Sequence, residues 1–193
     1  MNGRYREDRA LAPWREAGRK TRLETRVFRV VERHMHEVPD RGEGRHGTFY
    51  NIDPPDWVNV VALTSDRRVV LIEQFRHGTD AFTLEIPGGM VDPGESPLRA
   101  ARRELAEESG YAAARWEKLG IVHPNPAIQT NTTHTFLAID AERIHEPSFD
   151  TNEACRLVLA AWTDALEAVD RGEITHALVV CALHFAARRL GSS

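Results

Sequence analysis

The sequence contains few cysteines and no long apolar run, and these shortages argue against several classes of protein. Its two cysteines, Cys155 and Cys181, are too few for a disulfide framework and include no CxxC pair of the kind that binds zinc. The longest apolar stretch, residues 177–187, is interrupted by a histidine and is too short to span a bilayer. The first ten residues are charged and lack an apolar segment, which argues against a secretory signal peptide. We therefore expect a cytoplasmic protein with no membrane partner.

An excess of positive charge is also missing, because the formal net charge is −4 at pH 7. A general nucleic-acid binder usually presents a basic surface, so this balance argues against a nucleic-acid partner. Lysine is rare as well: Lys20 and Lys118 are the only two among 25 basic residues, and the others are arginine. The planar guanidinium suits bidentate binding of phosphate groups, although genome composition explains the same bias equally well.

The length of 193 residues, with 41% hydrophobic and 28% charged residues, is typical of one globular domain with a small appendage. Residues 1–21 are polar and are predicted to form a leader. Residues 22–56 contain two strand-like segments separated by turn-forming residues, which indicates an N-terminal β-hairpin. The apolar content rises at Trp57, so we place the main domain at residues 57–193.

The main domain mixes strand-like and helix-like patterns. The continuous apolar run at 68–75 is typical of a strand buried on both faces. Further strands are predicted at 57–64, 84–89, 119–122, 132–140 and 155–161, and helices at 97–109, 163–171 and 175–190. This mixture predicts an α/β sandwich rather than an all-helical or all-β fold.

The helix at 97–109 has clear start and stop signals. Ser96 can cap its N-terminus, Pro97 suits its first turn, and Gly110 can end it. Its apolar residues form one narrow stripe that can face a sheet.

Three carboxylates, Glu104, Glu107 and Glu108, share one face of this helix because they are spaced at i, i+3 and i+4. Like charges at these spacings destabilise a helix by about 0.2–0.5 kcal/mol per pair. A bound Mg²⁺ would neutralise them, since it prefers oxygen ligands and is usually completed by water and substrate phosphates. Taken alone, the pattern also fits a solvated acidic face, and the flanking residues decide in favour of a metal site.

Those flanking residues resemble the signature of the Nudix hydrolases. Gly89 is followed after five residues by Glu95, and after seven more by the run RELAEESG at 103–110. Seven fixed positions give a chance match on the order of 10⁻⁸ per start point. One position departs, because the family prefers an aliphatic residue where this chain has Tyr111. The departure puts local packing in question rather than catalysis.

The resemblance extends over about residues 22–190 and is similar to the branch that hydrolyses ADP-ribose and related nucleoside diphosphate sugars. The segments VVLIEQFRHG, LEIPGGMVDPGES and HPNPAIQTNTTHTFLA carry it, and Pro126 stands where this branch has a proline. The resemblance implies a Nudix-like α/β/α sandwich with a mixed sheet. It also implies that the N-terminal hairpin is a dimerisation element, so we expect a homodimer.

The resemblance also implies a metal site built from Glu104, Glu107, Glu108 and the backbone carbonyl of Gly88. Mg²⁺ is the expected metal, with Mn²⁺ as a substitute. Glu107 matches a carboxylate that often bridges metals, and we expect it to take part in catalysis. Arg103 is placed among the catalytic residues because it could orient a neighbouring carboxylate.

The catalytic base is expected on the acidic loop SFDTNEAC. Glu153 aligns with a metal-binding glutamate of the family and is our predicted base. The position of the family's own base falls on Thr151, which is a poor base. Asp150 and a glutamate of the signature therefore stay as alternatives.

Three further residues are predicted to contact the substrate. Arg76 follows a buried strand, so its guanidinium could grip a phosphate or ribose, or form a surface salt bridge. Trp57 could stack on a nucleobase or belong to the core. Glu85 matches an acidic position of the family, where it could approach the metal or serve the structure.

Together these features predict metal-dependent hydrolysis of a pyrophosphate bond. The expected substrate is ADP-ribose or a related nucleotide sugar, cleaved to a nucleoside monophosphate and a sugar phosphate. Metal ions can stabilise charge on the attacking and leaving oxygens and lower the pKa of bound water, and a glutamate can accept its proton. The alternatives are a dinucleoside polyphosphate, coenzyme A, or a catalytically silent nucleotide-sugar sensor. The three clustered carboxylates argue against the sensor, which has no need of them.

Overall fold

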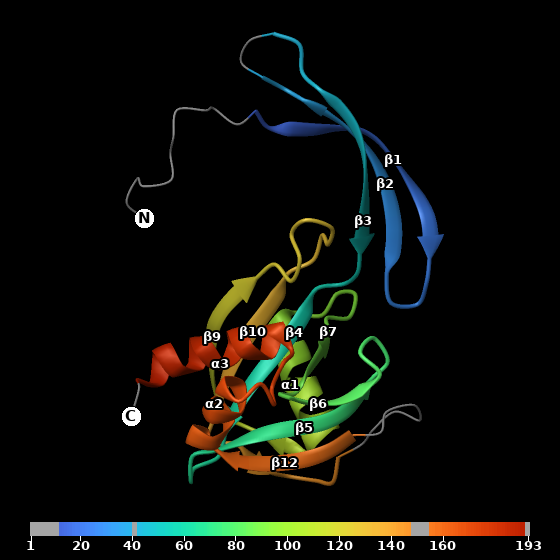
Figure 1. Ribbon diagram of the computed structural model, residues 1–193. Coiled ribbons are helices and arrows are strands. Elements are labelled where there is room, and N and C mark those ends of the chain that lie inside the picture. The colour runs from blue at the N-terminus through green and yellow to red at the C-terminus, as the bar shows by residue number, and fades with distance from the viewer. Residues whose placement is uncertain (1–11, 40–41, 148–154, 192–193) are drawn as a thin grey trace. The chain divides into compact units, whose positions relative to one another are not determined.

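The computed structural model describes residues 12–39, 42–147 and 155–191 (Figure 1). The chain divides into two compact units, each with a β-sheet of its own. The first unit consists of Met1–Pro54 with Asn125–Thr130, and the second of Pro55–Pro124 with Asn131–Ser193.

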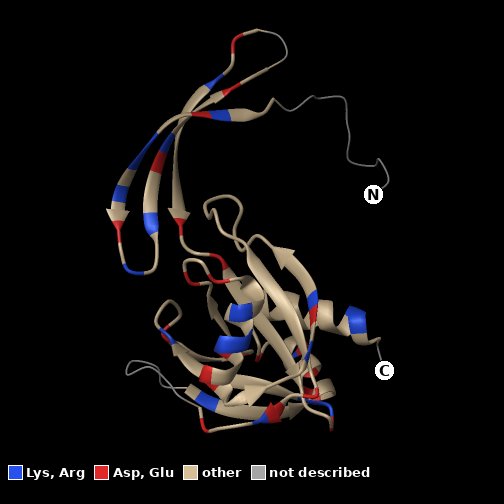
Figure 2. Ribbon diagram, turned by 180° about the vertical axis from the view of Figure 1, so that it is seen from behind, with Lys and Arg blue, Asp and Glu red and all other residues tan. Residues whose placement is uncertain are grey.

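The first unit contains a three-stranded antiparallel sheet in the order β1 (Trp14–Glu24), β2 (Arg29–Glu37) and β3 (His46–Asp53). Acidic and basic residues are interspersed along the strands (Figure 2), and some pair across them. Arg33 Nε lies 2.6 Å from Glu16 Oε2, for example. Within these three strands only Val31 and Glu32 are buried. Backbone hydrogen bonds and ion pairs, rather than a hydrophobic core, therefore hold this sheet together.

Strand β1 corrects the prediction of a polar leader followed by a two-stranded hairpin, because it adds a strand to the hairpin formed by β2 and β3. β1 begins at Trp14, so residues 14–21 belong to the sheet and not to a leader, while residues 1–11 lie outside the described ranges. Strands are recognised in a sequence by alternating apolar residues that face a core. Because β1 is largely exposed on both faces, its sequence WREAGRKTRLE carries no such alternation.

The second unit contains a seven-stranded sheet whose main path runs β12-β5-β4-β10-β9, with β6 paired to β5 and β7 paired to β4. β4 and β10 are parallel, and the other pairs are antiparallel, so the sheet is mixed. Its strands are β4 (Trp57–Leu63), β5 (Arg68–Arg76), β6 (Ala81–Glu85), β7 (Gly88–Met90), β9 (Arg115–Val122), β10 (Thr133–Ile139) and β12 (Cys155–Ala161). Two short strands, β8 (Tyr111–Ala112) and β11 (Glu142–Arg143), pair with each other.

Helices cover both faces of this mixed sheet (Figure 1). On one face, α1 (Pro97–Ser109) packs through Leu105 into a core cluster that includes Val60 of β4. On the other face, α2 (Trp162–Asp170) and α3 (Ala177–Leu190) share a second cluster with Val61. Neighbouring residues of β4 thus serve opposite cores, as a doubly buried strand requires. The predicted α/β/α sandwich with a mixed sheet is confirmed. Within the described ranges, no helix is long and apolar enough to cross a membrane.

α1 begins and ends where its sequence predicts. The Ser96 side chain accepts a hydrogen bond from the Arg99 N–H, and Pro97 occupies the first turn. Gly110 ends the helix in a left-handed conformation with φ of +73°. A Cβ there would also overlap the carbonyl oxygen of His145, so both conformation and space require glycine.

Tyr111, the one departure from the Nudix signature, is 6% exposed and belongs to the core cluster on the α1 side of the sheet. The departure therefore affects hydrophobic packing, as its position in the sequence predicts.

Candidate active site

Gly88 and Gly89 lie on β7, against one face of α1. β7 pairs with β4 so that Gly88 stands opposite Asn59 and Gly89 opposite Val58. α1 packs against both strands. The carboxylates of α1 and the backbone of β7 therefore meet in one place.

Gly89 leaves room for a carboxylate of α1, and Gly88 leaves room for the backbone of β4. The Gly88 N–H donates to Oε2 of Glu108 at 2.8 Å, and Glu108 is 8% exposed. A Cβ at Gly88 would overlap the carbonyl oxygen of Val58, and a Cβ at Gly89 would overlap the carboxylate of Glu104. Any larger residue at either position would displace the strand or a carboxylate.

Arg103 joins the acidic side chains around it. Its Nη1 donates to Glu104 Oε1 at 2.7 Å and to Glu107 Oε2 at 3.2 Å. Its Nη2 donates to the carbonyl oxygen of Met90 at 2.9 Å and to Glu95 Oε2 at 3.0 Å. One guanidinium thus connects two carboxylates of α1 with β7 and with the loop that precedes the helix.

These contacts shift the pKa values of their members. The hydrogen bond from Arg103 lowers the pKa of Glu95, and it outweighs the opposing effect of burial. The hydrogen bond to Glu95, supported by those to Glu104 and Glu107, raises the pKa of Arg103 against the effect of its own burial. A permanent positive charge therefore sits among the carboxylates at neutral pH.

The carboxylates offer oxygen donors, but they do not form a complete cage. Among the described residues, no three acidic, histidine or cysteine side chains are grouped closely enough to hold a metal ion. Glu104 and Glu107 converge on Arg103, while Glu108 contacts the Gly88 amide. Mg²⁺ commonly binds through one or two carboxylates together with water and phosphate oxygens. This donor set fits a Mg²⁺ ion that arrives with a phosphorylated substrate.

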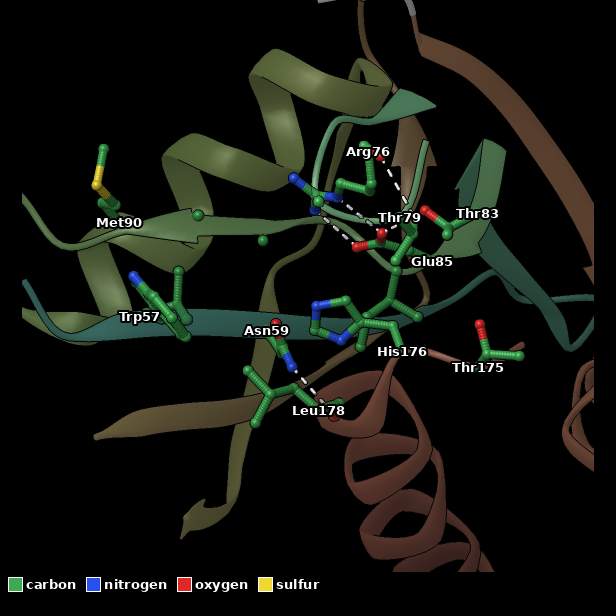
Figure 3. Close-up of a pocket in the computed structure, with 15 residues that line it drawn as sticks. Trp57, Asn59, Arg76, Thr79, Thr83, Glu85, Met90, Thr175, His176 and Leu178 are labelled. Atoms are coloured by element: carbon green, nitrogen blue, oxygen red, sulfur yellow. Dashed lines mark hydrogen bonds and ion pairs between the residues drawn. The ribbon is translucent and has the colours of Figure 1, made fainter. Parts of the chain in front are cut away.

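A pocket of about 500 Å³ opens beside the β7 glycines, which form part of its wall (Figure 3). Trp57 and Met90 lie toward one end, and Arg76 and Glu85 toward the other. Trp57, which was predicted to contact the substrate, is partly exposed in this wall. All three residues predicted to contact a substrate therefore line one pocket that borders the acidic cluster.

Arg76 and Glu85, the other two residues predicted to contact the substrate, form a bidentate ion pair with each other. Nε and Nη2 of Arg76 donate to the two carboxylate oxygens of Glu85 at 2.8 and 2.7 Å. Thr83 Oγ1 donates to Glu85 Oε1 at 2.6 Å. Burial of Glu85 opposes its ionisation, but the hydrogen bonds from Arg76 and Thr83 outweigh that effect and lower its pKa. The pair is therefore charged on both sides at neutral pH and neutral as a whole.

Two further pocket residues were missed by sequence reasoning. Asn59 lies on β4, and its Nδ2 donates to the carbonyl oxygen of Leu178 at 3.2 Å. His176 immediately precedes α3 and lines the pocket. A lone polar residue inside the apolar run WVNVVAL was the one signal for Asn59. Nothing in the local sequence marks His176, because only the fold brings it to β4.

The predicted base Glu153 and the alternative Asp150 fall within residues 148–154, outside the described part of the chain, as does Thr151. Their roles stay predictions.

Comparison with known proteins assigns the family. Residues 53–183 match the NUDIX domain, which is more than half of the chain. The chain therefore belongs to the NUDIX family, and the predicted class of Nudix pyrophosphohydrolase is confirmed.

The similarity to known proteins extends over most of the chain. An ADP-ribose pyrophosphatase of Bacillus subtilis is 27% identical over 169 residues, which cover 86% of this chain and 91% of the relative. A GDP-mannose pyrophosphatase of Cronobacter sakazakii is 32% identical over 167 residues, which cover 82% and 81%. The crystal structure of an ADP compounds hydrolase has a TM-score of 0.80 at 23% identity and covers 94% of this chain and 96% of that one. This last likeness shows the shared fold.

Replacement of Gly89 tests whether the position of the Glu104 carboxylate matters for turnover. In Gly89→Ala the new Cβ must push that carboxylate away from β7. Because the displaced atoms end a flexible side chain, we expect the fold to survive while kcat falls by about 10- to 100-fold. Steady-state kinetics and thermal unfolding of the same preparation measure both effects.

Gly18→Ala on β1 is the matched control, since the nearest atom to its new Cβ would be 4.0 Å away. A Gly89→Ala protein with the kcat of the parent would show that the Glu104–Gly89 contact plays no part in the reaction.

Proposed function

We propose that this chain is a Mg²⁺-dependent pyrophosphatase that cleaves ADP-ribose or a related nucleoside diphosphate sugar to a nucleoside monophosphate and a sugar phosphate. One observation carries the proposal. The glycines that contact Glu104 and Glu108 also line the adjoining pocket. A diphosphate at the glycines would lie beside the acidic cluster, with an attached group in the pocket.

The reaction adds one water molecule across the P–O–P bridge. The water oxygen bonds to one phosphorus, the bridging oxygen leaves with the other, and a proton of the water passes to a base. Bound Mg²⁺ would neutralise the diphosphate and lower the pKa of the attacking water. Glu104, Glu107, Glu108 and the Gly88 carbonyl are the proposed ligands, and Mn²⁺ is a proposed substitute.

The residues of the chain itself have separate tasks in this scheme. Arg103 holds Glu104 and Glu107 in place, and the Gly88 N–H fixes the orientation of Glu108. Glu153 is the proposed base, with Asp150 and a glutamate of the signature as alternatives. In this scheme the base accepts a proton from the attacking water, and the other groups hold the metal-binding carboxylates in place.

The two ends of the pocket suit different parts of a nucleotide sugar. Trp57 and Met90 offer an aromatic and a flexible apolar surface, on which a nucleobase could stack. Arg76 and Glu85 offer hydrogen-bonding groups at the other end. The β7 glycines also line this pocket, where the diphosphate is proposed to lie.

The names of similar proteins support a nucleotide sugar over a dinucleoside polyphosphate or coenzyme A. Those relatives are an ADP-ribose pyrophosphatase and a GDP-mannose pyrophosphatase. The intact set of signature carboxylates argues against a silent sensor.

A substrate panel tests this proposal. ADP-ribose, ADP-glucose, GDP-mannose, a diadenosine polyphosphate and coenzyme A are incubated with Mg²⁺ or Mn²⁺, and phosphate is measured after phosphatase treatment. We expect cleavage of ADP-ribose or one of the sugars, abolished by EDTA. In Glu107→Gln and Glu108→Gln the rate should fall by about 10- to 100-fold, because each loses a negatively charged metal ligand.

Glu142→Gln on the exposed strand β11 is the control and should keep the parent rate. Cleavage that persists in EDTA, or parent rates in both carboxylate variants, would refute the metal site. Cleavage of coenzyme A alone would refute the nucleotide-sugar assignment.

We also propose that the sheet of the first unit pairs two copies of the chain. Leu23, Phe49 and Tyr50 are about half exposed in this sheet, with 52%, 45% and 58% of their surface accessible. A small sheet that buries so little of its own surface is marginally stable alone. Exposed apolar side chains of this kind favour an interface.

The oligomeric state tests this pairing. The full chain should elute as a dimer in size-exclusion chromatography with light scattering, and Phe49→Glu should shift it toward the monomer by placing a charge in the interface. Ile144→Glu, at a position 61% exposed in the second unit, should leave the dimer intact. A monomeric parent, or a dimer unchanged by Phe49→Glu, would contradict the proposal.

A further inference from the structure

Asn59 is a polar residue within the apolar run of β4, and its side chain lines the pocket. It is 8% exposed, and its amide carries both a hydrogen-bond donor and an acceptor. Trp57 lies two residues earlier on the same strand, so the two side chains leave the same face of the sheet. Asn59 therefore stands in the pocket wall next to the aromatic end.

The contact with α3 fixes the orientation of the Asn59 amide. Nδ2 donates to the carbonyl oxygen of Leu178 at 3.2 Å, as the dashed line in Figure 3 shows. A carbonyl oxygen can only accept a hydrogen bond, so it must face the amide nitrogen and not the amide oxygen. The same bond therefore turns Oδ1 of Asn59 away from the Leu178 carbonyl.

The Oδ1 atom lies beside a glycine of β7 and is open to the pocket. Gly88 stands opposite Asn59 in the sheet, and a Cβ on Gly88 would lie 2.8 Å from Oδ1. Within the described ranges Oδ1 accepts no hydrogen bond, and it is not among the fully buried side-chain atoms that lack a partner. An acceptor in such a sheltered position is unfavourable unless water or a ligand donates to it.

The chemistry of this acceptor selects the group that can meet it. A carbonyl oxygen has no proton to give, and the oxygens of an ionised diphosphate are acceptors as well, so the two repel. In the proposed arrangement a nucleobase lies at Trp57 and the diphosphate at Gly88 and Gly89. The ribose joins these two groups and carries two hydroxyls. Asn59 is next to Trp57 on its own strand and opposite Gly88, so the ribose would pass in front of it.

We infer that Oδ1 of Asn59 accepts a hydrogen bond from the 2′- or 3′-hydroxyl of the ribose in the nucleoside half of the substrate. The inference rests on the proposed function, since it requires a nucleotide sugar in this pocket. The preferred substrates are then nucleoside diphosphate sugars whose nucleoside ribose keeps both hydroxyls. A substrate without the bonded hydroxyl leaves the acceptor unpaired and is turned over less efficiently.

The parent enzyme provides the first test. Its kcat/KM is measured on ADP-ribose and on two analogues in which the adenosine ribose lacks either the 2′- or the 3′-hydroxyl. We expect one of the two analogues to show a kcat/KM about three- to tenfold below that of ADP-ribose, because it cannot donate to Oδ1. The other analogue should stay within about twofold.

The variant Asn59→Leu removes the acceptor while keeping a side chain of similar size. It also removes the bond to Leu178, but that loss affects all three substrates alike. We therefore expect the preference for ADP-ribose over the analogues to shrink to within about twofold, whatever happens to the absolute rates. Circular dichroism shows whether the variant is folded.

Two further variants separate the acceptor from its surroundings. Asn59→Asp keeps an oxygen acceptor and loses the donor to Leu178, so its overall kcat/KM should fall while the preference for the hydroxyl stays. Asn51→Leu is the matched control, because Asn51 is also a strand residue whose Nδ2 donates to a backbone carbonyl, that of Ile128 at 3.4 Å. It lies in the first unit and should keep the preference of the parent.

The remaining outcomes overturn the inference. Equal kcat/KM of the parent on all three substrates would show that no ribose hydroxyl is bonded. A preference unchanged in folded Asn59→Leu would assign it to another residue, and a preference lost in Asn59→Asp would assign it to the bond with Leu178. If the parent cleaves no nucleotide sugar, the proposed function falls together with the inference. Normal cleavage of ADP-ribose with any of the first three results overturns the inference alone.

Discussion

The site depends on the guanidinium of Arg103. Three carboxylates on one face of α1 would otherwise repel each other, and Glu104 and Glu107 instead converge on this one cation. The same side chain donates to the Met90 carbonyl oxygen and to Glu95, so it also ties the helix to β7 and to the loop before it. The signature residues therefore meet a geometric requirement. Gly89 leaves space for the Glu104 carboxylate, and Arg103 bonds to that carboxylate and to β7 at the same time.

The site combines two regions of different electrostatic character. The acidic side, on α1, carries the carboxylates proposed to bind a cation together with the diphosphate. The pocket side has charged groups that cancel, since Arg76 and Glu85 bond to each other in its wall. The β7 glycines belong to both regions, because they contact the carboxylates and line the pocket. This arrangement separates the groups proposed for bond cleavage from those proposed to distinguish substrates.

Sequence reasoning succeeded where the signal is local. Ser96, Pro97 and Gly110 mark the ends of α1, because capping residues act within one turn. The spacing of Glu104 and Glu108 likewise places them on one face of the helix. It failed for β1, which buries neither face, and for His176, which meets β4 only through the packing of α3. A salt bridge was one of the two alternatives for Arg76, but its partner Glu85 was not predicted, because that contact depends on the pairing of β5 with β6.

The most direct test of the account is the turnover of Arg103→Lys with ADP-ribose and Mg²⁺. Lysine keeps the positive charge, but its single ammonium group cannot reproduce the planar fork that meets Met90, Glu95, Glu104 and Glu107 together. We predict that kcat falls by about tenfold or more while circular dichroism shows a folded protein. A folded Arg103→Lys enzyme with the parent kcat would contradict the claim that this guanidinium organises the site.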